Sequence, residues 1–104
     1  MEINLDAPKT KVTREDIEHN IIECYYLNLG SAIEKEYNVP VGGPASTTTL
    51  CVVLLKNGYT VTGESACADP ANYDRELGEK YALEDAIKKI WPLMGYELKT
   101  RLSQ

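Results

Sequence analysis

NGYTVTGESACADPANYD, residues 57–74, is the stretch of sequence that decides the fold. Asn57 followed by Gly58 favours a two-residue type I′ hairpin turn, because both central residues of that turn need positive φ. The residues before the turn are rich in β-branched side chains, and Tyr-Thr-Val-Thr follows it at 59–62. We therefore expect a central antiparallel hairpin over about residues 47–65.

The small residues after the second strand, at 63–69, are expected to continue it through a bulge until Pro70 ends it. The amphipathic segment that comes next predicts a helix over about 74–91, capped by Asn72 or Asp74. Its spacing assigns a buried face made of Leu77, Tyr81, Ala82, Ala86, Ile90 and Leu93.

Pro92 is expected to stop this helix, because proline lacks the backbone N–H and its ring clashes with the preceding turn. Gly95 then supplies a turn, and the tail at 96–102 is expected to fold back on the core.

The N-terminal half opens with a predicted arm or edge strand over 1–11, followed by TRED at 13–16, a helix capping box. A short strand is expected over 25–29, one or two helical turns over 31–37 and a loop over 39–45. Helical spacing also places four residues on one stripe of the first helix: Ile17, Ile21, Ile22 and Tyr25.

These elements predict an α+β fold in which an antiparallel sheet packs against an N-terminal helix and a long C-terminal helix. At 104 residues, the chain is expected to form a single domain, 1–104.

The composition argues against two classes of partner. A net charge of −5 is unsuited to tracking a nucleic-acid polymer, and the sequence holds no run of 18 apolar residues that would span a membrane. Charge is uneven, with eight acids against four bases in 1–38 and six of each in 74–101. The C-terminal half can therefore still present a local cationic pocket.

The three cysteines, Cys24, Cys51 and Cys67, form no CxxC pair and fit neither a zinc ribbon nor a disulfide framework. We expect reduced thiols, with Cys51 a small core residue, and neither a metal nor a cofactor.

Three groups could carry catalysis or hold a cation, and each has a simpler interpretation. His19 has acids around it, which indicates a solvated helix face. Cys67 precedes a helix start that could activate a thiolate, but no base is assigned to it, so a small hydrolase ranks last among the functions. The acids Glu64, Asp69 and Asp74 lack the spacing of a calcium loop, and Asp74 is better explained as a cap.

Anion binding is the remaining possibility. A bend of small residues before a helix exposes backbone N–H groups, and Arg75 stands in the first turn while Arg101 lies near the C-terminus. The ordinary alternative, core aromatic residues with surface arginines, stays open. The rings that could stack on a base are Tyr73, Tyr81, Trp91 and Tyr96.

The stretch LKNGYTVTGESACADPANYDRELGEKYALEDAIKKIWPLMGYELKTRL, residues 55–102, resembles a family of small tailed-phage accessory proteins with the signature NGFTVxGESACxDPxNFD…KIWPLxGY. The resemblance is weaker over the N-terminal half. The family looks related to the Thoeris anti-defence sponge proteins, which sequester cyclic ADP-ribose signals, and some of which also hold cyclic oligonucleotides.

What the resemblance implies is a phage anti-defence protein in the cytoplasm of the infected host cell that binds a nucleotide-derived signal without cleaving it. It also implies a homo-oligomer, a dimer or an assembly of dimers, with the ligand at a subunit interface. Carried over onto this sequence, the ligand-binding residues are Tyr73, Arg75, Asp85 and Arg101. Asp85 departs from the asparagine expected in the sponge proteins.

The alternative function is an acidic phage protein that binds and inhibits a host protein. Residues 1–38, with their excess of acids, would then form the contact surface.

Overall fold

The computed structural model describes residues 10–104, so the predicted arm lies almost wholly outside the described residues. The elements follow one another as α1 (Arg14–Asn20), β1 (Ile21–Asn28), α2 (Leu29–Tyr37), the 3-10 turn η1 (Gly43–Thr47), β2 (Thr48–Leu55), β3 (Thr60–Ala66), the 3-10 turn η2 (Pro70–Asn72) and α3 (Arg75–Leu102).

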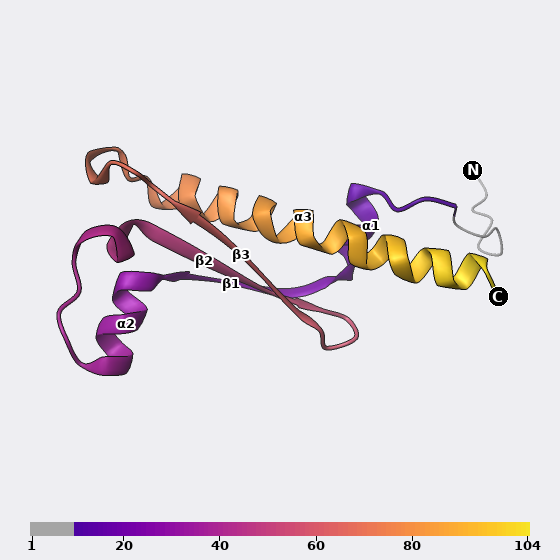
Figure 1. Ribbon diagram of the computed structural model, residues 1–104, viewed down its shortest axis with the longest axis horizontal. Coiled ribbons are helices and arrows are strands. Elements are labelled where there is room, and N and C mark those ends of the chain that lie inside the picture. The colour runs from indigo at the N-terminus through magenta and orange to yellow at the C-terminus, as the bar shows by residue number, and fades with distance from the viewer. Residues whose placement is uncertain (1–9) are drawn as a thin grey trace.

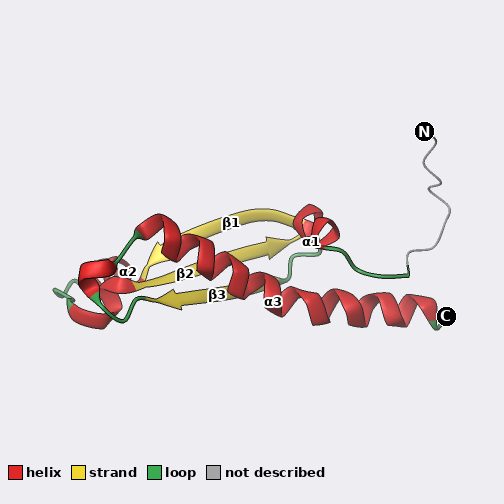
Figure 2. Cartoon of the chain, turned by 90° about the horizontal axis from the view of Figure 1, so that it is seen from above, coloured by secondary structure: helices red, strands yellow, loops and turns green. Residues whose placement is uncertain are grey.

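The strands form one antiparallel sheet in the order β1-β2-β3. Figure 2 shows α3 lying across one face of this sheet, with its C-terminal part projecting beyond the strands. α2 and α1 stand at opposite ends of β1 (Figure 1). The predicted α+β architecture, with a central hairpin packed against an N-terminal and a long C-terminal helix, is thus confirmed. No helix among residues 10–104 combines the length and the apolar character needed to cross a membrane.

The core fills the space between the sheet and α3. Burial alternates strictly along β2, so that every second side chain faces the helix, as expected of a strand with one covered face. Cys51 is fully buried there, as predicted. The buried apolar residues are Ile17, Cys51, Val53, Leu55, Val61, Ala82, Ala86, Ile87 and Ile90.

Gly63 allows α3 to approach β3 closely. A Cβ atom built on Gly63 would lie 2.9 Å from the Cα of Ala86, and closer still to the backbone oxygen of Ala82 and the backbone nitrogen of Ala86. The backbones of strand and helix therefore touch at this point, which only a residue without a side chain permits.

Two side chains of α3 occupy the free edge of β3. The carboxylate of Asp85 accepts a hydrogen bond from the backbone N–H of Glu64 at 3.0 Å, and Lys89 Nζ donates to the backbone oxygen of Thr62 at 2.8 Å. Edge strands otherwise leave such groups open to pairing with another chain. These contacts fix the helix along the strand and protect its edge.

The hairpin lies where the sequence placed it, but its turn differs from the prediction. The backbone N–H of Gly58 donates to Leu55 at 2.9 Å, and that of Leu55 donates to Tyr59, which leaves a three-residue loop. Gly58 has φ 88°, whereas Asn57 does not have positive φ, so the type I′ turn was wrong. A turn followed by a left-handed glycine is the usual three-residue hairpin loop.

The bulge was also predicted in the wrong strand. The register between β2 and β3 is unbroken, and the one shift in pairing lies on β1 between Ile21 and Glu23. The first helix ends earlier than its apolar spacing predicted: α1 stops at Asn20, and Ile21, Ile22 and Tyr25 belong to β1. Their β-branched and aromatic side chains suit a strand, and pairing with β2 outweighs the helical spacing.

The largest correction concerns α3, which continues through Pro92 to Leu102 instead of stopping. Pro92 is exposed, so the carbonyl that loses its helical partner can be hydrated. There is consequently no turn at Gly95 and no tail that folds back. The buried face is also rotated: Ile87 joins Ala82, Ala86 and Ile90, whereas three residues predicted to be buried are about half exposed, namely Leu77, Tyr81 and Leu93.

Candidate functional site

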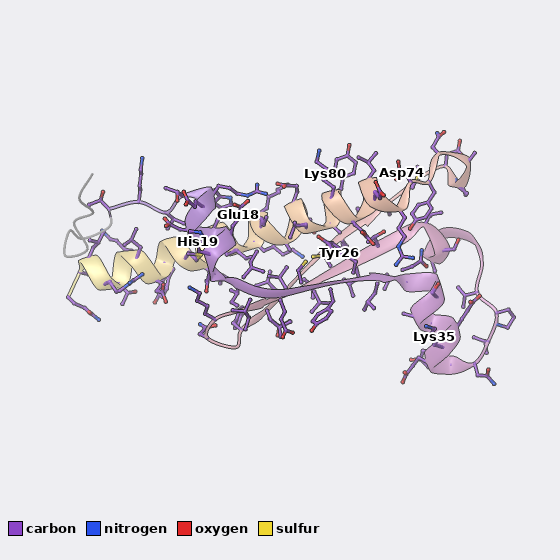
Figure 3. The ribbon with its side chains drawn as sticks, turned by 180° about the vertical axis from the view of Figure 1, so that it is seen from behind. Glu18, His19, Tyr26, Lys35, Asp74 and Lys80 are labelled. Atoms are coloured by element: carbon purple, nitrogen blue, oxygen red, sulfur yellow. The ribbon has the colours of Figure 1, made fainter. Side chains whose placement is uncertain are left out.

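Two pockets lie at opposite ends of α3. The helix-start pocket, of about 200 Å³, is formed where β3, η2 and the start of α3 meet. The C-terminal pocket, of about 440 Å³, lies between α1, the hairpin loop and the last turns of α3. In Figure 3, Asp74 lies at the start of α3 and His19 lies beside the half of this helix nearer its C-terminus.

The C-terminal pocket collects basic groups from separate parts of the chain. Lys11 precedes α1, His19 lies on α1, Lys56 stands in the hairpin loop and Arg101 on the last turn of α3. Two acids, Asp16 and Glu97, are also present, and the guanidinium of Arg101 pairs with Glu97 at 3.1 Å. The pocket thus combines lysine and arginine cations from three separate parts of the chain, and an anionic ligand could displace Glu97 from Arg101.

Apolar side chains line the rest of the C-terminal pocket. Val12, Met94 and Leu98 contribute to its wall, and the side-chain amide of Asn20 donates to the sulfur of Met94 at 3.6 Å. An apolar wall with a few convergent polar groups is the usual composition of a small-molecule site, and its volume falls within the range of such sites.

The helix-start pocket is more apolar and contains Tyr73 together with Leu77, Tyr81 and Cys67. The hydroxyl of Tyr73 accepts a hydrogen bond from the side-chain amide of Asn28 at 3.3 Å, which ties the ring to the end of β1. Two tyrosines around one small cavity are suited to stacking on a planar ligand.

Several backbone donors of this bend are already used within the fold. The carboxylate of Asp69 accepts from the N–H of Ala71 at 3.0 Å, and the carboxylate of Asp74, the N-cap of α3, accepts from Leu77 at 3.3 Å. A carboxylate at a helix N-terminus neutralises the positive end of the dipole. The N–H groups of Ala71 and Leu77 are therefore already bound to carboxylates where the sequence suggested a phosphate site.

The four predicted ligand residues do not meet within one chain. Arg75 pairs with Glu79 at 3.2 Å beside the helix-start pocket, whereas Arg101 lines the C-terminal pocket. Because an α-helix rises 1.5 Å per residue, about 39 Å of α3 separates them. Asp85 lies between, on the edge of β3, where its bond from Glu64 and the nearby Lys89 lower the pKa of its carboxyl group.

The simpler interpretations of His19 and Cys67 fit the structure. His19 is exposed and stands 3.9 Å from Glu15 on the same helix. The thiol of Cys67 donates to the backbone oxygen of Asp69 at 3.1 Å, and a carbonyl cannot remove its proton. Across residues 10–104, no group of three His, Cys, Asp or Glu side chains could hold a metal ion.

Sequence reasoning missed Lys11 and Lys56, which join Arg101 in the C-terminal pocket. No spacing rule could have found them, since their proximity depends on α3 continuing through Pro92 to reach the hairpin loop. It also missed the contact between Cys24 and Cys51, whose sulfur atoms lie 3.4 Å apart.

Comparison with known proteins gives one match. The sequence model described as "Phage protein (N4 Gp49/phage Sf6 gene 66) family" matches residues 12–102, nearly the whole described chain. No curated protein matches, and no solved structure matches.

Proposed function

The chain belongs to the phage protein (N4 Gp49/phage Sf6 gene 66) family, and from that premise we propose that it binds and sequesters a nucleotide-derived immune signal without cleaving it. The signal is of the cyclic ADP-ribose type, and cyclic oligonucleotides form the second ligand class. The proposed setting is the cytoplasm of the infected host cell.

One observation carries the proposal. In a chain of net charge −5, four basic side chains gather around a single concave pocket of about 440 Å³: Lys11, His19, Lys56 and Arg101. Two acids, Asp16 and Glu97, line the same pocket, so its lysine and arginine side chains outnumber its acids by three to two. A pyrophosphate would find several donors there, including a guanidinium suited to a bidentate contact.

A ligand that also stacks on Tyr73 requires a second copy of the chain. Since about 39 Å of helix separates the two ends of α3, Tyr73 and Arg75 of one copy can meet Arg101 only of another. The proposed assembly is therefore a homodimer, or an oligomer of dimers, whose ligand lies between the helix-start pocket of one subunit and the C-terminal pocket of its partner.

Calorimetry against cyclic ADP-ribose isomers and cyclic di- and trinucleotides tests the proposal. We expect saturable binding, and recovery of the unchanged ligand after the protein is denatured. If the ligand is broken down, the protein is a hydrolase and does not sequester its ligand. If no ligand of either class binds, the proposal is overturned.

Matched arginine variants locate the site. Arg101→Ala should weaken binding at least tenfold without changing the unfolding curve, because its side chain is 65% exposed and pairs only with Glu97 among the described residues. Arg75→Ala makes the same kind of change at the other end, where Arg75 is 66% exposed and pairs with Glu79. Loss of affinity in both variants supports a site shared by two subunits, whereas loss in Arg101→Ala alone supports a site within one chain.

A second function, inhibition of a host protein through an acidic surface, is favoured by the exposed acids of α1. The side chains of Glu15 and Glu18 are 77% and 56% exposed. Co-purification of a host protein that is lost in a Glu15→Lys, Glu18→Lys variant would support this alternative, and unchanged nucleotide binding in that variant would separate the two functions.

A further inference from the structure

Two of the three thiols are in contact inside the sheet. Cys24 lies on β1 and Cys51 on β2, and their sulfur atoms are 3.4 Å apart. Cys24 pairs with Val53 and Cys51 with Tyr26, so the two cysteines are diagonal neighbours with side chains on the same face, toward α3. A disulfide bond is about 2.05 Å long, so the sulfurs must approach by about 1.3 Å to form one.

We expect β1 to make this movement, because it lies at an edge of the sheet. Among residues 10–104, β1 pairs with β2 alone and forms an edge of the sheet, and its register already shifts between Ile21 and Glu23. β2, in contrast, is held on both sides and beneath α3. Diagonal neighbours in an ordinary antiparallel pair stand about 7–8 Å apart, whereas the Cα atoms of a disulfide stand about 5.5–6 Å apart, so closure requires the backbone of β1 to shift toward β2.

We propose that Cys24 and Cys51 form a reversible intramolecular disulfide when the reduced protein meets a low-molecular-weight disulfide such as oxidised glutathione. The thiolate of Cys24 attacks one sulfur of the oxidant, which forms a mixed disulfide and releases one glutathione thiolate. The thiolate of Cys51 then attacks the sulfur of Cys24 and displaces the second glutathione. Two protein thiols are oxidised and one glutathione disulfide is reduced to two glutathione thiols, which take up the two protons that the protein thiols lose.

The burial of the two thiols sets this order. Cys24 is half-buried and can be reached from solvent, whereas Cys51 is fully buried, with the sulfur of Cys24 in contact. Burial, and then Cys24 and Glu79 nearby, raise the pKa of the Cys51 thiol to about 12, and Tyr26 lies beside the pair. Since the thiolate is the nucleophile, the second step should accelerate about tenfold per pH unit between pH 7 and 9.

The crosslink would fix the edge strand to the centre of the sheet. It closes a loop that contains α2 and η1, and it joins β1, which ends at Asn28, to the strand that supports the core. The oxidised protein should therefore unfold at a higher denaturant concentration than the reduced protein.

The test is oxidation of the reduced full chain with oxidised glutathione at pH 8.5, followed by alkylation and mass spectrometry. We expect an intact mass with one alkyl group, on Cys67, and two hydrogens fewer, where the reduced protein carries three alkyl groups, and a crosslinked peptide that joins Cys24 to Cys51. Cys67→Ser, which removes the one cysteine outside the pair, should give the same crosslink. A wild-type protein that stops at mixed disulfides, or that crosslinks through Cys67, would overturn the proposal.

Cys24→Ser gives the decisive comparison, because its half-buried position tolerates a hydroxyl better than the fully buried Cys51. Under the proposal this variant gains no denaturant resistance after oxidation, while wild type and Cys67→Ser do. An equal gain in all three proteins would mean that the effect does not arise from the pair. These readouts do not involve the ligand, so they stand or fall independently of the proposed sequestration.

Discussion

Gly63→Ala should remove a large part of the stability of the fold. The added methyl group would come within 3 Å of three backbone atoms of α3, so the helix must move outward by about 1 Å. A buried aliphatic side chain gains about 40 contacts of about 0.1 kcal/mol each, which gives roughly 8 kcal/mol for Ile87 and Ile90 together. A gap of that width forfeits about half, or roughly 4 kcal/mol. Strain from overpacking adds about 1–3 kcal/mol.

The expected loss is thus about 5–7 kcal/mol, out of the 5–15 kcal/mol typical of a folded domain. Urea unfolding monitored by far-UV circular dichroism and by the fluorescence of Trp91, the one tryptophan, measures it. If the variant stays within about 1 kcal/mol of the parent, then the strand and helix backbones do not touch at Gly63.

Gly95→Ala is the matched control. A Cβ atom at Gly95 meets nothing within 4 Å, and the residue lies inside α3, so the same chemical change should stabilise the protein by about 0.5–1 kcal/mol. Opposite signs for the two substitutions would isolate the close contact from any general effect of replacing glycine.

Three further predictions concern α3. Pro92→Ala restores a helical hydrogen bond and should stabilise the protein by about 1–3 kcal/mol and increase its helical signal; a loss of helix would contradict a continuous α3. Asp85→Ala should cost about 1 kcal/mol and accelerate hydrogen exchange at the Glu64 amide, whereas Asp85→Asn, which keeps an acceptor, should cost less. The unfolding midpoint should fall as the pH drops below about 4.5, since Arg14 lowers the pKa of Glu84 and Glu64 N–H lowers that of Asp85, and this stability is lost when both carboxylates protonate. A midpoint unchanged between pH 5 and 3 would contradict it.

The parts of the fold that depend on local chemistry could be predicted from the sequence. The capping box at Thr13 forms as expected, with hydrogen bonds in both directions to Asp16, and Asp74 caps α3. The hairpin strands also match, because alternation and β-branched side chains act over a few residues. Each of these features is decided by neighbours along the chain.

The features that failed depend on contacts between distant segments. Isoleucines at 17, 21 and 22 fit a helix stripe, and only pairing of β1 with β2 converts the last two to strand. Gly63 leaves room for the backbone of α3, so the small residues Ala82 and Ala86 pack against the sheet there. Leu77 is then about half exposed. Hydrophobicity alone does not reveal that shape complementarity.

The candidate site was predictable only in part, for the same reason. Arg101 was identified through the family resemblance and does line the C-terminal pocket, together with two lysines that no motif marks. Its predicted partners Tyr73 and Arg75 lie at the far end of α3, and the sequence contains no signal of helix length beyond the misleading Pro92. Whether they converge depends on assembly, which local patterns do not encode.

The close approach at Gly63 also gives α3 a fixed point about which the helix can tilt. The helix rests on the strand at Ala86, and 16 residues farther on its tip at Leu102 stands about 24 Å from that fulcrum. A tilt of about 5° at the fulcrum swings the tip by about 2 Å, which is enough to make or break a hydrogen bond. Any event that rocks the helix on the sheet is therefore magnified at Arg101, even when nothing touches the tip itself.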